Sequence, residues 1–596
     1  MARSFPPEDP LLHGASRDAK PSGKKRRSLW SRLFLTLFSM RLDKSGHRLY
    51  VAMLAFMVVF GAISWKLATL ANLPDEASTK IFQPDQIAKA RPDIVDRNGI
   101  VLATDLKTDS VYAEPRRLID KDEAVELITA VLPDVDAREL REKFTKKKGF
   151  VWIKRRISPK EREEIFRLGL PGIGFAPESK RIYPNGTAAA HILGGAGVDN
   201  NGIAGIEKYI DGQGLSDLAG AGLAAQPADL TPVKLTLDLR VQHALRDELM
   251  KGMDKYKAKA VGGMVIDVTT GEVIALASLP DFDPNIPGDA LDPDKINRVI
   301  VGTYEMGSTF KALTLAMALD SGKETINSQL DARSDLRYGK YTIGDFHPTH
   351  RILTVPEVFI HSSNIGTAKM ALAVGVDGHK AFLKKMGQLD RLHTELPESA
   401  EPQVPKYWSE LTTVTVAYGH GLAVAPIQAV MAVCALVNGG NMMPPTFLPR
   451  SQEQADAMSV KVIKPETSEA MRYLMRLNAA NKLGTAGKAD IDGYFVGGKT
   501  GTANKNFHGH YDASKVFTTF MAIAPADKPK YLFMTIMDEP QAVQGTFGFQ
   551  TAGWNAGPVT GAVIERTAAF LDMPKRFDPP AAPFPTMVKL GAWGTK

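Results

Sequence analysis

A run of 17 uncharged and mostly apolar residues lies near the start of the chain. It spans 49–65 and reads LYVAMLAFMVVFGAISW; after Lys66 the apolar character continues over 67–71 as LATLA. A lysine near the end of such a segment can extend its ammonium group to the interface, so about 20 residues are available to cross a bilayer as a helix. A cleaved signal peptide has an apolar core of only about 7–15 residues behind a short basic head. The sequence therefore predicts one transmembrane signal anchor over 49–71.

The charge in front of this segment predicts its orientation. Residues 1–48 contain 11 Lys or Arg and four Asp or Glu, so this basic tail carries the whole net charge of +7. Basic residues beside a span stay in the cytoplasm, which places the N-terminus inside and the folded part in the periplasm, on the outer face of the inner membrane. Because the chain after the tail has no net basic charge, a nucleic-acid partner is not expected.

Composition divides the rest of the chain into two domains and a tail. Residues 72–232 mix short strand patterns with charged helical segments, which predicts a mixed α/β module that serves as a pedestal. Within it, Asn98-Gly99 lies between two alternating runs and predicts a β-hairpin. Residues 233–575 have strand patterns at both ends and helical patterns in the middle, which predicts an α+β domain. The proline-rich residues 576–596 predict a flexible tail.

Periodicity predicts the elements of the larger domain. Strands are expected at 233–237, 263–268, 272–277, 494–496, 517–524 and 531–537, and helices at 239–253 and 559–571. Several more helical segments are expected within 309–445.

The chain contains one cysteine, Cys434, in the middle of an apolar run. One cysteine excludes an intramolecular disulfide and any multi-cysteine zinc or iron–sulfur centre. The run predicts that Cys434 is a small buried hydrophobic residue and not a nucleophile. The histidines lack the helical spacing and carboxylate partners of a metal site, so neither a metal nor another cofactor is expected.

Ser308-Thr-Phe-Lys311 is the first of three short polar motifs, and it opens an apolar helical stretch. Residues i and i+3 share a helix face, so Lys311 is expected to reach the Ser308 hydroxyl. A serine becomes a good nucleophile only when a neighbouring base takes its proton, and a lysine can do this when its amine is neutral. Burial among the apolar residues that follow would disfavour the charged amine. The backbone N–H of Ser308, at a helix N-terminus, could then face a developing oxyanion.

The second and third motifs supply groups for proton relay and peptide binding. Ser362-Ser-Asn364 offers a hydroxyl and an amide. Lys499-Thr-Gly-Thr502 follows a predicted strand, and offers a positive charge and two hydroxyls to a carboxylate; the Thr502 N–H could complete an oxyanion hole. Gly501 would let a substrate backbone approach the strand closely.

Each motif alone is common, but their joint order resembles that of the penicillin-binding proteins. The chain is similar to the class B members, which are monofunctional peptidoglycan transpeptidases, over about 91–573. The similarity includes the segments Arg91…Asp96-Arg-Asn-Gly99, Gly205-Ile-Glu207, Leu235-Thr-Leu-Asp238, Asn297-Arg298, Tyr304–Lys311 and Tyr418–Gln428. Two residues depart from common patterns: Met306 stands where family members often have proline, and Ser363 stands where many β-lactamases have aspartate.

The resemblance implies a fold. It is a penicillin-binding or β-lactamase-like transpeptidase domain, an antiparallel sheet with helices on both sides, behind a dimerisation-type pedestal and a single transmembrane helix.

The resemblance also implies an acyl transfer. Ser308 would attack the D-Ala-D-Ala carbonyl of a stem peptide, with Lys311 and Ser362 as the other catalytic residues. Substrate binding would fall to the remaining motif residues: Asn364, Lys499, Thr500, Gly501 and Thr502. An amine from a second stem peptide would resolve the acyl-enzyme, and β-lactams would acylate Ser308 as substrate mimics.

The length and single anchor resemble the septal, division-specific branch. The implied partners are divisome proteins and a polytopic glycan polymerase of the membrane. An elongation-type transpeptidase and a divisome scaffold with dispensable catalysis are the alternatives. A β-lactamase is not favoured, because no Glu-x-x-Leu-Asn motif lies between Ser363 and Lys499.

Overall fold

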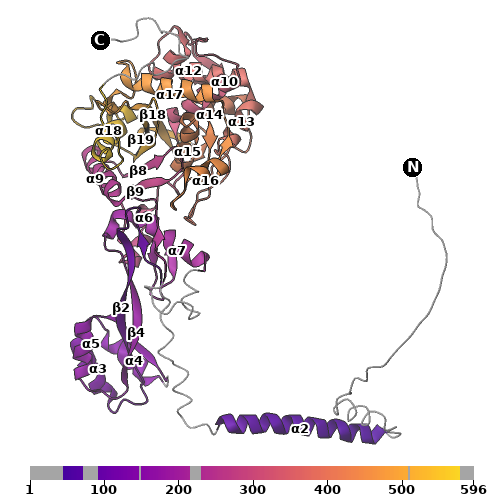
Figure 1. The fold of residues 1–596 in the computed structure, drawn as a ribbon, viewed down its shortest axis with the longest axis vertical. Coiled ribbons are helices and arrows are strands. Elements are labelled where there is room, and N and C mark those ends of the chain that lie inside the picture. Colours follow the sequence, from indigo (N-terminus) through magenta and orange to yellow (C-terminus); the bar gives the residue numbers. More distant parts are fainter. Residues whose placement is uncertain (1–44, 72–90, 147–148, 215–229, 508–509, 578–596) are drawn as a thin grey trace, which may run out of the picture. The chain divides into compact units, whose positions relative to one another are not determined.

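The computed structural model of the chain describes residues 45–71, 91–146, 149–214, 230–507 and 510–577 (Figure 1). The chain forms two compact units, 1–83 and 84–596. Nearly all of the predicted basic tail, and the C-terminal tail from residue 578, lie outside the described residues.

In the described part of the first unit, residues 45–71 form the long helix α2 (Ser45–Ala71), which includes the whole predicted anchor. Its described apolar side chains are exposed, among them Met57 at 70% and Trp65 at 76%. Across the residues that the structure describes, no helix meets both the length and the hydropathy required of a membrane span. The transmembrane anchor therefore stays a prediction.

The pedestal is built on a five-stranded sheet. Its strands are β1 (Ile94–Val95), β2 (Val101–Ala113), β3 (Val151–Ile157), β4 (Ile173–Ile182) and β7 (Val233–Lys234). The predicted hairpin at Asn98-Gly99 is confirmed, because β1 pairs antiparallel with β2 and Gly99 adopts a φ of 87°. The predicted strand 233–237 is shorter than expected: β7 pairs parallel with β1 and so belongs to the pedestal sheet.

Helices α3 (Lys121–Val131), α4 (Ala137–Thr145) and α5 (Pro159–Arg167) surround a separate small hydrophobic core of the pedestal. Asp120, Asp136 and Ser158 cap their N-termini by accepting backbone N–H groups. Two further helices, α6 (Ala190–Leu193) and α7 (Gly205–Gly212), flank the short strand pair β5 (Gly195–Ala196) and β6 (Gly202–Ala204). The prediction of a mixed α/β pedestal agrees with these elements.

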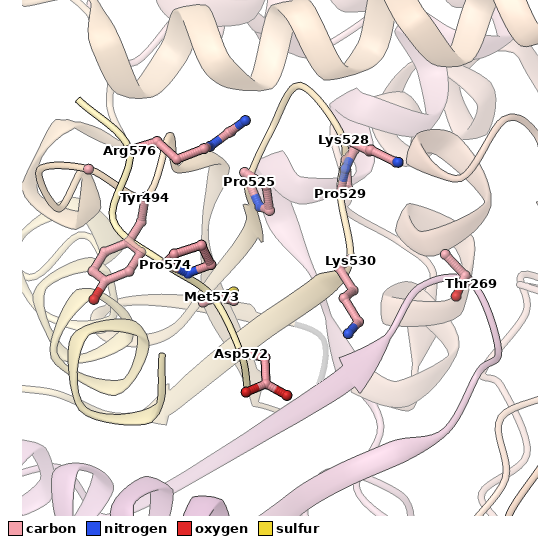
Figure 2. Close-up of a pocket in the computed structure, with 11 residues that line it drawn as sticks. Thr269, Tyr494, Pro525, Lys528, Pro529, Lys530, Asp572, Met573, Pro574 and Arg576 are labelled. Carbon is pink, nitrogen blue, oxygen red and sulfur yellow. The ribbon is translucent and has the colours of Figure 1, made fainter. Parts of the chain in front are cut away.

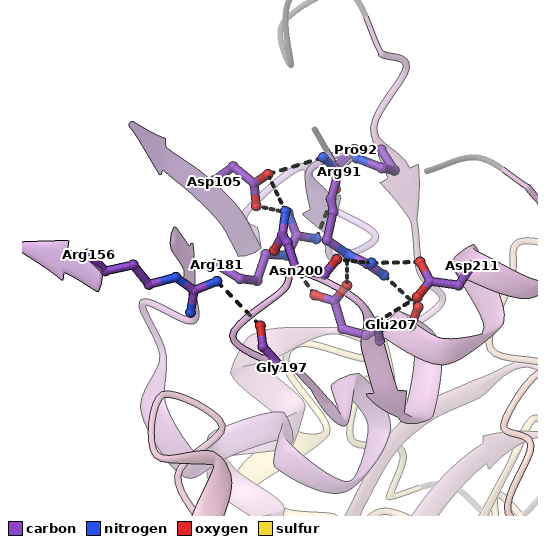
Figure 3. Close-up of polar contacts among 10 residues, drawn as sticks. Arg91, Pro92, Asp105, Arg156, Arg181, Gly197, Asn200, Glu207 and Asp211 are labelled. Atoms are coloured by element: carbon purple, nitrogen blue, oxygen red, sulfur yellow. Dashed lines mark hydrogen bonds and ion pairs between the residues drawn. The ribbon is translucent and has the colours of Figure 1, made fainter. Parts of the chain in front are cut away.

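A buried network of charges joins the start of the pedestal to α7 (Figure 3). The fully buried Arg91 guanidinium donates to Glu207 Oε2 at 2.7 Å and to Asp211 Oδ1 at 2.6 Å. Arg181 donates to Glu207 Oε1 at 2.6 Å and to Asp105 Oδ1 at 3.1 Å. The two arginines thus share one carboxylate, so every charge in the network has an opposite charge beside it.

Replacing Arg91 with methionine is expected to destabilise the protein by roughly 3–5 kcal/mol, because it leaves buried carboxylates without their cation. Thermal unfolding of the purified chain would measure the loss. The matched control is Arg117→Met, since Arg117 is exposed and its ion pair with Glu114 should contribute almost nothing. Equal stability of the two variants would contradict a structural role for the network.

The larger domain contains a five-stranded sheet in the order β18-β19-β20-β8-β9, with every neighbouring pair antiparallel. The strands are β8 (Ala260–Asp267), β9 (Val273–Leu279), β18 (Gly497–Phe507), β19 (His510–Ala524) and β20 (Tyr531–Asp538). Strands from both ends of the domain therefore meet in one sheet, as predicted.

Helices cover both faces of this sheet (Figure 1). Helices α9 (Leu239–Tyr256) and α18 (Ala556–Thr567) pack on one face, where Phe520 and Ala522 contribute to their core. On the opposite face, Met521 and Ile523 join the core that contains α10 (Phe310–Asp320), α15 (Pro426–Val437) and α17 (Pro465–Ala480). Alternate residues of β19 thus enter different cores. The predicted antiparallel sheet with helices on both sides is confirmed.

The other helices of the domain are α11 (Val355–Ile360), α12 (Asn364–Val374), α13 (Val376–Lys385), α14 (Glu410–Ala417) and α16 (Gln452–Met458). Short strand pairs are formed by β10 (Tyr304–Glu305) with β15 (Ala423–Val424), β11 (Gln329–Asp331) with β14 (Ile352–Thr354), β12 (Leu336–Tyr338) with β13 (Tyr341–Ile343), and β16 (Asn441–Met442) with β17 (Val460–Lys461).

Three predictions from the sequence can be compared with the structure of this domain. The predicted strand 494–496 is wrong: Phe495 adopts a φ of 49°, which interrupts an extended chain, and β18 begins at Gly497. Cys434 is buried within α15 as predicted, and burial raises the pKa of its thiol. Arg576 lies at the start of the predicted flexible tail but donates to Asp527 at 2.7 Å, so this residue is held by the domain.

Candidate active site

Ser308 lies in a tight turn directly before α10. The turn is a 3-10 helix, η7 (Gly307–Thr309), and Ser308 is partly buried within it. Met306 has a φ of −82°, near the value that proline would fix, so methionine at this position leaves the turn intact. Gly307 follows with a φ of 53°, which few other residues tolerate. The predicted nucleophile thus stands at the entrance of a buried helix.

Lys311 is almost completely buried, with 1% of its surface exposed. Its Nζ lies 3.1 Å from Ser362 Oγ and also contacts the Ser362 carbonyl oxygen. Burial, aided by the charge of Lys499 and opposed by Asp345, lowers the pKa of Lys311 well below its usual value. Within the described residues no hydrogen bond joins Lys311 to Ser308. The Lys311 amine donates to Ser362 instead, so the predicted contact within the first motif is replaced by one to the second motif.

The second motif lies in the turn between α11 and α12. Ser362 has a φ of 56°, a left-handed conformation that directs its hydroxyl to both lysines of the site. Asn364 begins α12, and its side-chain N–H donates to the Gly344 carbonyl at 2.8 Å. To bind a substrate peptide, the Asn364 side chain would either give up this hydrogen bond or use an amide atom that the bond leaves free.

Asp345 was not identified by the sequence reasoning, although it holds the second motif in place. Its carboxylate accepts from the Ser363 hydroxyl at 2.7 Å and from the Ile365 backbone N–H at 3.0 Å. It therefore ties the loop after β13 to the N-terminus of α12. No local pattern marks this residue, since it lies 17 residues before the motif that it contacts.

The third motif lies on β18. Lys499 is buried, and its Nζ donates to Ser362 Oγ at 3.0 Å and to the Thr500 carbonyl at 3.2 Å. The sequence predicts a fixed positive charge on Lys499. Burial lowers the pKa of Lys499 to about 7, so the amine changes its charge near neutral pH. Thr500 donates to the Thr485 hydroxyl at 2.8 Å, and Thr502 accepts from the Ala552 N–H at 3.2 Å.

Glycines bring the first and third motifs into backbone contact. A Cβ at Gly501 would overlap the carbonyl oxygen of Met306, and one at Gly307 would lie 2.7 Å from the carbonyl oxygen of Thr502. A Cβ at Gly419 would overlap the carbonyl oxygen of Gly307. Three segments remote in sequence therefore meet around Ser308. The structure brings all the predicted site residues into one region, and the roles assigned to them stay predictions.

A methyl group at Gly501 is expected to separate β18 from the turn that carries Ser308. Overpacking of this kind typically costs about 1–3 kcal/mol, and a shift of the strand should slow acylation of Gly501→Ala by at least about tenfold. Stopped-flow labelling with a fluorescent penicillin would measure the rate. The control is Gly212→Ala in α7, where no atom lies within 4 Å of the added Cβ; a Gly501→Ala rate equal to the control would contradict the packing argument.

The low pKa of Lys499 predicts how ligand binding depends on pH. The lysine is cationic below its pKa of about 7, so affinity for a carboxylate-bearing β-lactam should fall as the pH rises through that value. Lys499→Arg, which keeps its charge, should flatten this dependence. The non-covalent dissociation constant, taken from the concentration dependence of acylation between about pH 6 and about pH 9, gives the readout. A pH-independent constant in the wild type would contradict the prediction.

A separate cavity of about 480 Å³ lies beside the end of the described chain (Figure 2). Tyr494, Pro525 and Pro574 line it together with Lys528 and Lys530. None of the predicted site residues lines this cavity. Among the described residues, no group of three or more His, Cys, Asp or Glu could hold a metal ion.

Two family models match the chain. The model described as the penicillin-binding protein transpeptidase domain matches residues 261–564, which is more than half of the chain. The model described as the penicillin-binding protein dimerisation domain matches residues 86–213.

Named relatives and a solved structure agree with these matches. A Caulobacter vibrioides protein named probable peptidoglycan D,D-transpeptidase FtsI is 39% identical over 497 residues, 82% of each chain. The Escherichia coli peptidoglycan D,D-transpeptidase FtsI is 28% identical over 542 residues, 86% of this chain and 89% of the relative. The crystal structure of a peptidoglycan synthetase from Bifidobacterium adolescentis has a similar fold, with a TM-score of 0.63 at 22% identity, covering 83% of this chain and 97% of that one. The chain therefore belongs to the penicillin-binding protein family, as a class B member of the FtsI type.

Proposed function

We propose that the chain is a peptidoglycan D,D-transpeptidase that cross-links stem peptides through an acyl-enzyme on Ser308. The observation that supports this most is the buried Lys311, whose pKa is lowered by burial and whose amine contacts Ser362. A neutral amine of this kind can accept the Ser308 proton when the hydroxyl attacks the carbonyl carbon of the penultimate D-alanine. The proton then passes to the departing terminal D-alanine, for which the Ser362 hydroxyl offers a path.

The second step reverses the first with a different amine. The amine of a neighbouring stem peptide attacks the ester carbonyl, loses a proton to the same lysine and serine pair, and releases Ser308 with its hydroxyl restored. A new peptide bond replaces the one that was broken, so no energy source beyond the substrate is needed.

Substrate binding is assigned to the residues around the nucleophile. Lys499, Thr500 and Thr502 would bind the terminal carboxylate of the donor peptide, and Asn364 would bind its backbone. The backbone N–H groups of Ser308 and Thr502 would stabilise the oxyanion, since the turn of Ser308 and β18 are in backbone contact. Gly501 allows that contact.

The cellular setting is proposed from the sequence and the named relatives. The apolar run within α2 would anchor the chain in the inner membrane with the N-terminus in the cytoplasm and the catalytic domain in the periplasm. The relatives named FtsI favour a role in septal wall synthesis, with a polytopic glycan polymerase and divisome proteins as partners and β-lactams as covalent inhibitors. A fluorescent fusion should concentrate at midcell; an even distribution along the side wall would favour the elongation role.

Release of D-alanine from a synthetic stem peptide ending in D-Ala-D-Ala tests the proposed reaction. With a second peptide as amine donor, mass spectrometry should find the cross-linked dimer in excess over the hydrolysed donor. A product mixture containing only hydrolysed peptide would indicate a carboxypeptidase, and no D-alanine release with a penicillin-reactive protein would indicate that the chosen donor is not a substrate.

A further inference from the structure

Glu305 lies three residues before Ser308 and joins three segments of the site. Its Oε1 atom accepts the backbone N–H of Gly421 at 2.8 Å and the phenolic O–H of Tyr511 at 2.9 Å. Gly421 follows Gly419, which packs against the turn of Ser308, and Tyr511 belongs to β19, the strand paired with β18. One carboxylate oxygen thus connects the nucleophile turn, the 419–421 loop and the β18–β19 hairpin.

Aromatic contacts reinforce the same connection. The His420 ring lies 5.7 Å from the Tyr511 ring and 5.4 Å from the Tyr418 ring. Tyr304 stacks on Phe517 of β19 at 4.0 Å, with the two rings nearly parallel. These ring contacts flank the hydrogen bond between Tyr511 and Glu305, while Tyr511 itself is 47% exposed.

The geometry of these segments makes the bond to Glu305 important for chemistry. The turn of Ser308 and β18 are in contact through the backbones of Gly307 and Gly501. Glycines have no side chains to interlock, so other contacts must keep the two segments together. Glu305 is attached to that turn through the chain, whereas Tyr511 is attached to β18 through the antiparallel pairing of Asn506 with Tyr511. The hydrogen bond between Glu305 and Tyr511 therefore gives the hairpin a second link to the nucleophile turn, in addition to the glycine contacts.

We propose that Glu305 is a positioning residue for acyl transfer, which acts through Tyr511 and the Gly421 N–H to keep β18 at the correct distance from Ser308. The inference rests on the proposed acylation of Ser308. A displacement of about 1 Å between reacting groups can cost a large factor in rate, so the effect should appear in the acylation rate constant more than in ligand affinity. Burial raises the pKa of Glu305, and the hydrogen bonds from the Gly421 N–H and the Tyr511 hydroxyl oppose that rise.

Acylation of the full-length chain by a fluorescent penicillin tests the inference, with its concentration dependence separating the acylation rate constant from the dissociation constant. Tyr511→Phe should lower the rate constant by about tenfold while its melting temperature stays within about 2 °C of the wild type. Glu305→Ala should lose at least as much, and Glu305→Gln, which keeps an acceptor oxygen, should recover part of the rate. The double variant Glu305→Ala/Tyr511→Phe should lose no more than Glu305→Ala alone.

The matched control is Tyr407→Phe, which removes a phenolic hydroxyl from a tyrosine that is 89% exposed and outside the site. A Tyr511→Phe rate constant equal to this control would overturn the inference, as would additive losses in the double variant. Acylation rate constants that fall in proportion to the melting temperatures of the variants would also overturn it, because they would show a role in stability alone. If the wild type itself is not acylated at Ser308, the proposed function fails first.

Discussion

Replacing Ser308 with alanine is expected to abolish covalent labelling by a fluorescent penicillin. In the proposed reaction the Ser308 oxygen becomes the ester oxygen, and alanine has no group to replace it, so the labelling rate should fall by about 10⁴-fold or more. The side chain is partly buried and small, so the substitution should leave the fold and the melting temperature almost unchanged. Gel fluorescence measures the label, and peptide mapping of the wild type should place it on Ser308.

The control for this experiment is Ser321→Ala, at the other end of α10. The Ser321 hydroxyl donates only to the Ala318 carbonyl, so this variant should label at the wild-type rate. Labelling that persists in Ser308→Ala would exclude Ser308 as the nucleophile. Growth of a depletion strain that expresses only Ser308→Ala would show that the reaction is dispensable in the cell and would favour the scaffold role.

Replacing Lys311 with methionine is expected to lower the acylation rate by about 10³-fold while making the protein more stable. The rate falls because general-base catalysis typically contributes 10²–10⁴-fold, and methionine cannot accept a proton. Stability rises because burial lowers the pKa of Lys311, so the charged amine is less favourable in the folded protein than in the unfolded chain, and methionine removes that cost. The melting temperature of the variant should therefore lie roughly 2 °C or more above that of the wild type.

The stability difference should depend on pH in one direction. Wild-type stability is lowest below the folded-state pKa of Lys311 and recovers as the pH rises toward the ordinary lysine value of 10.5, so the advantage of the variant should shrink at alkaline pH. Lys323→Met, an exposed lysine just after α10, is the control and should change neither quantity. A melting temperature of Lys311→Met below that of the wild type would contradict the prediction that Lys311 is buried at a cost to stability.

The motifs of the site could be predicted because each is short and has a recognisable order along the chain. Lys311, Ser362 and Lys499 meet, with both lysine amines within hydrogen-bond distance of the Ser362 hydroxyl oxygen, and the turn of Ser308 touches the strand that carries Lys499. The pattern could not show that Lys311 contacts Ser362 in place of Ser308. That choice depends on the left-handed backbone of Ser362, which positions its carbonyl and hydroxyl, and no local sequence preference specifies it.

Other features depend on contacts between residues far apart in the sequence. Asp345 and Glu305 each accept two hydrogen bonds from residues distant in the sequence, and a sequence gives no register for such contacts. The strand error at 494–496 has a similar origin: the residues have the composition of a strand, but Phe495 turns the backbone so that β18 can begin beside α17. The charge network around Arg91 has the same origin, because its carboxylates, Glu207 and Asp211, lie more than 100 residues further along the chain.

The glycine contacts around Ser308 also limit how a bacterium could evolve resistance to a drug that acylates this serine. A side chain at Gly307, Gly419 or Gly501 would displace the turn that carries Ser308 from its neighbours. That displacement would slow the reaction with the wall precursor as much as the reaction with the drug. Selection is therefore expected to leave these three positions unchanged. Tolerated changes should accumulate in the surrounding layer, where a shifted loop can discriminate between a rigid bicyclic inhibitor and a flexible peptide.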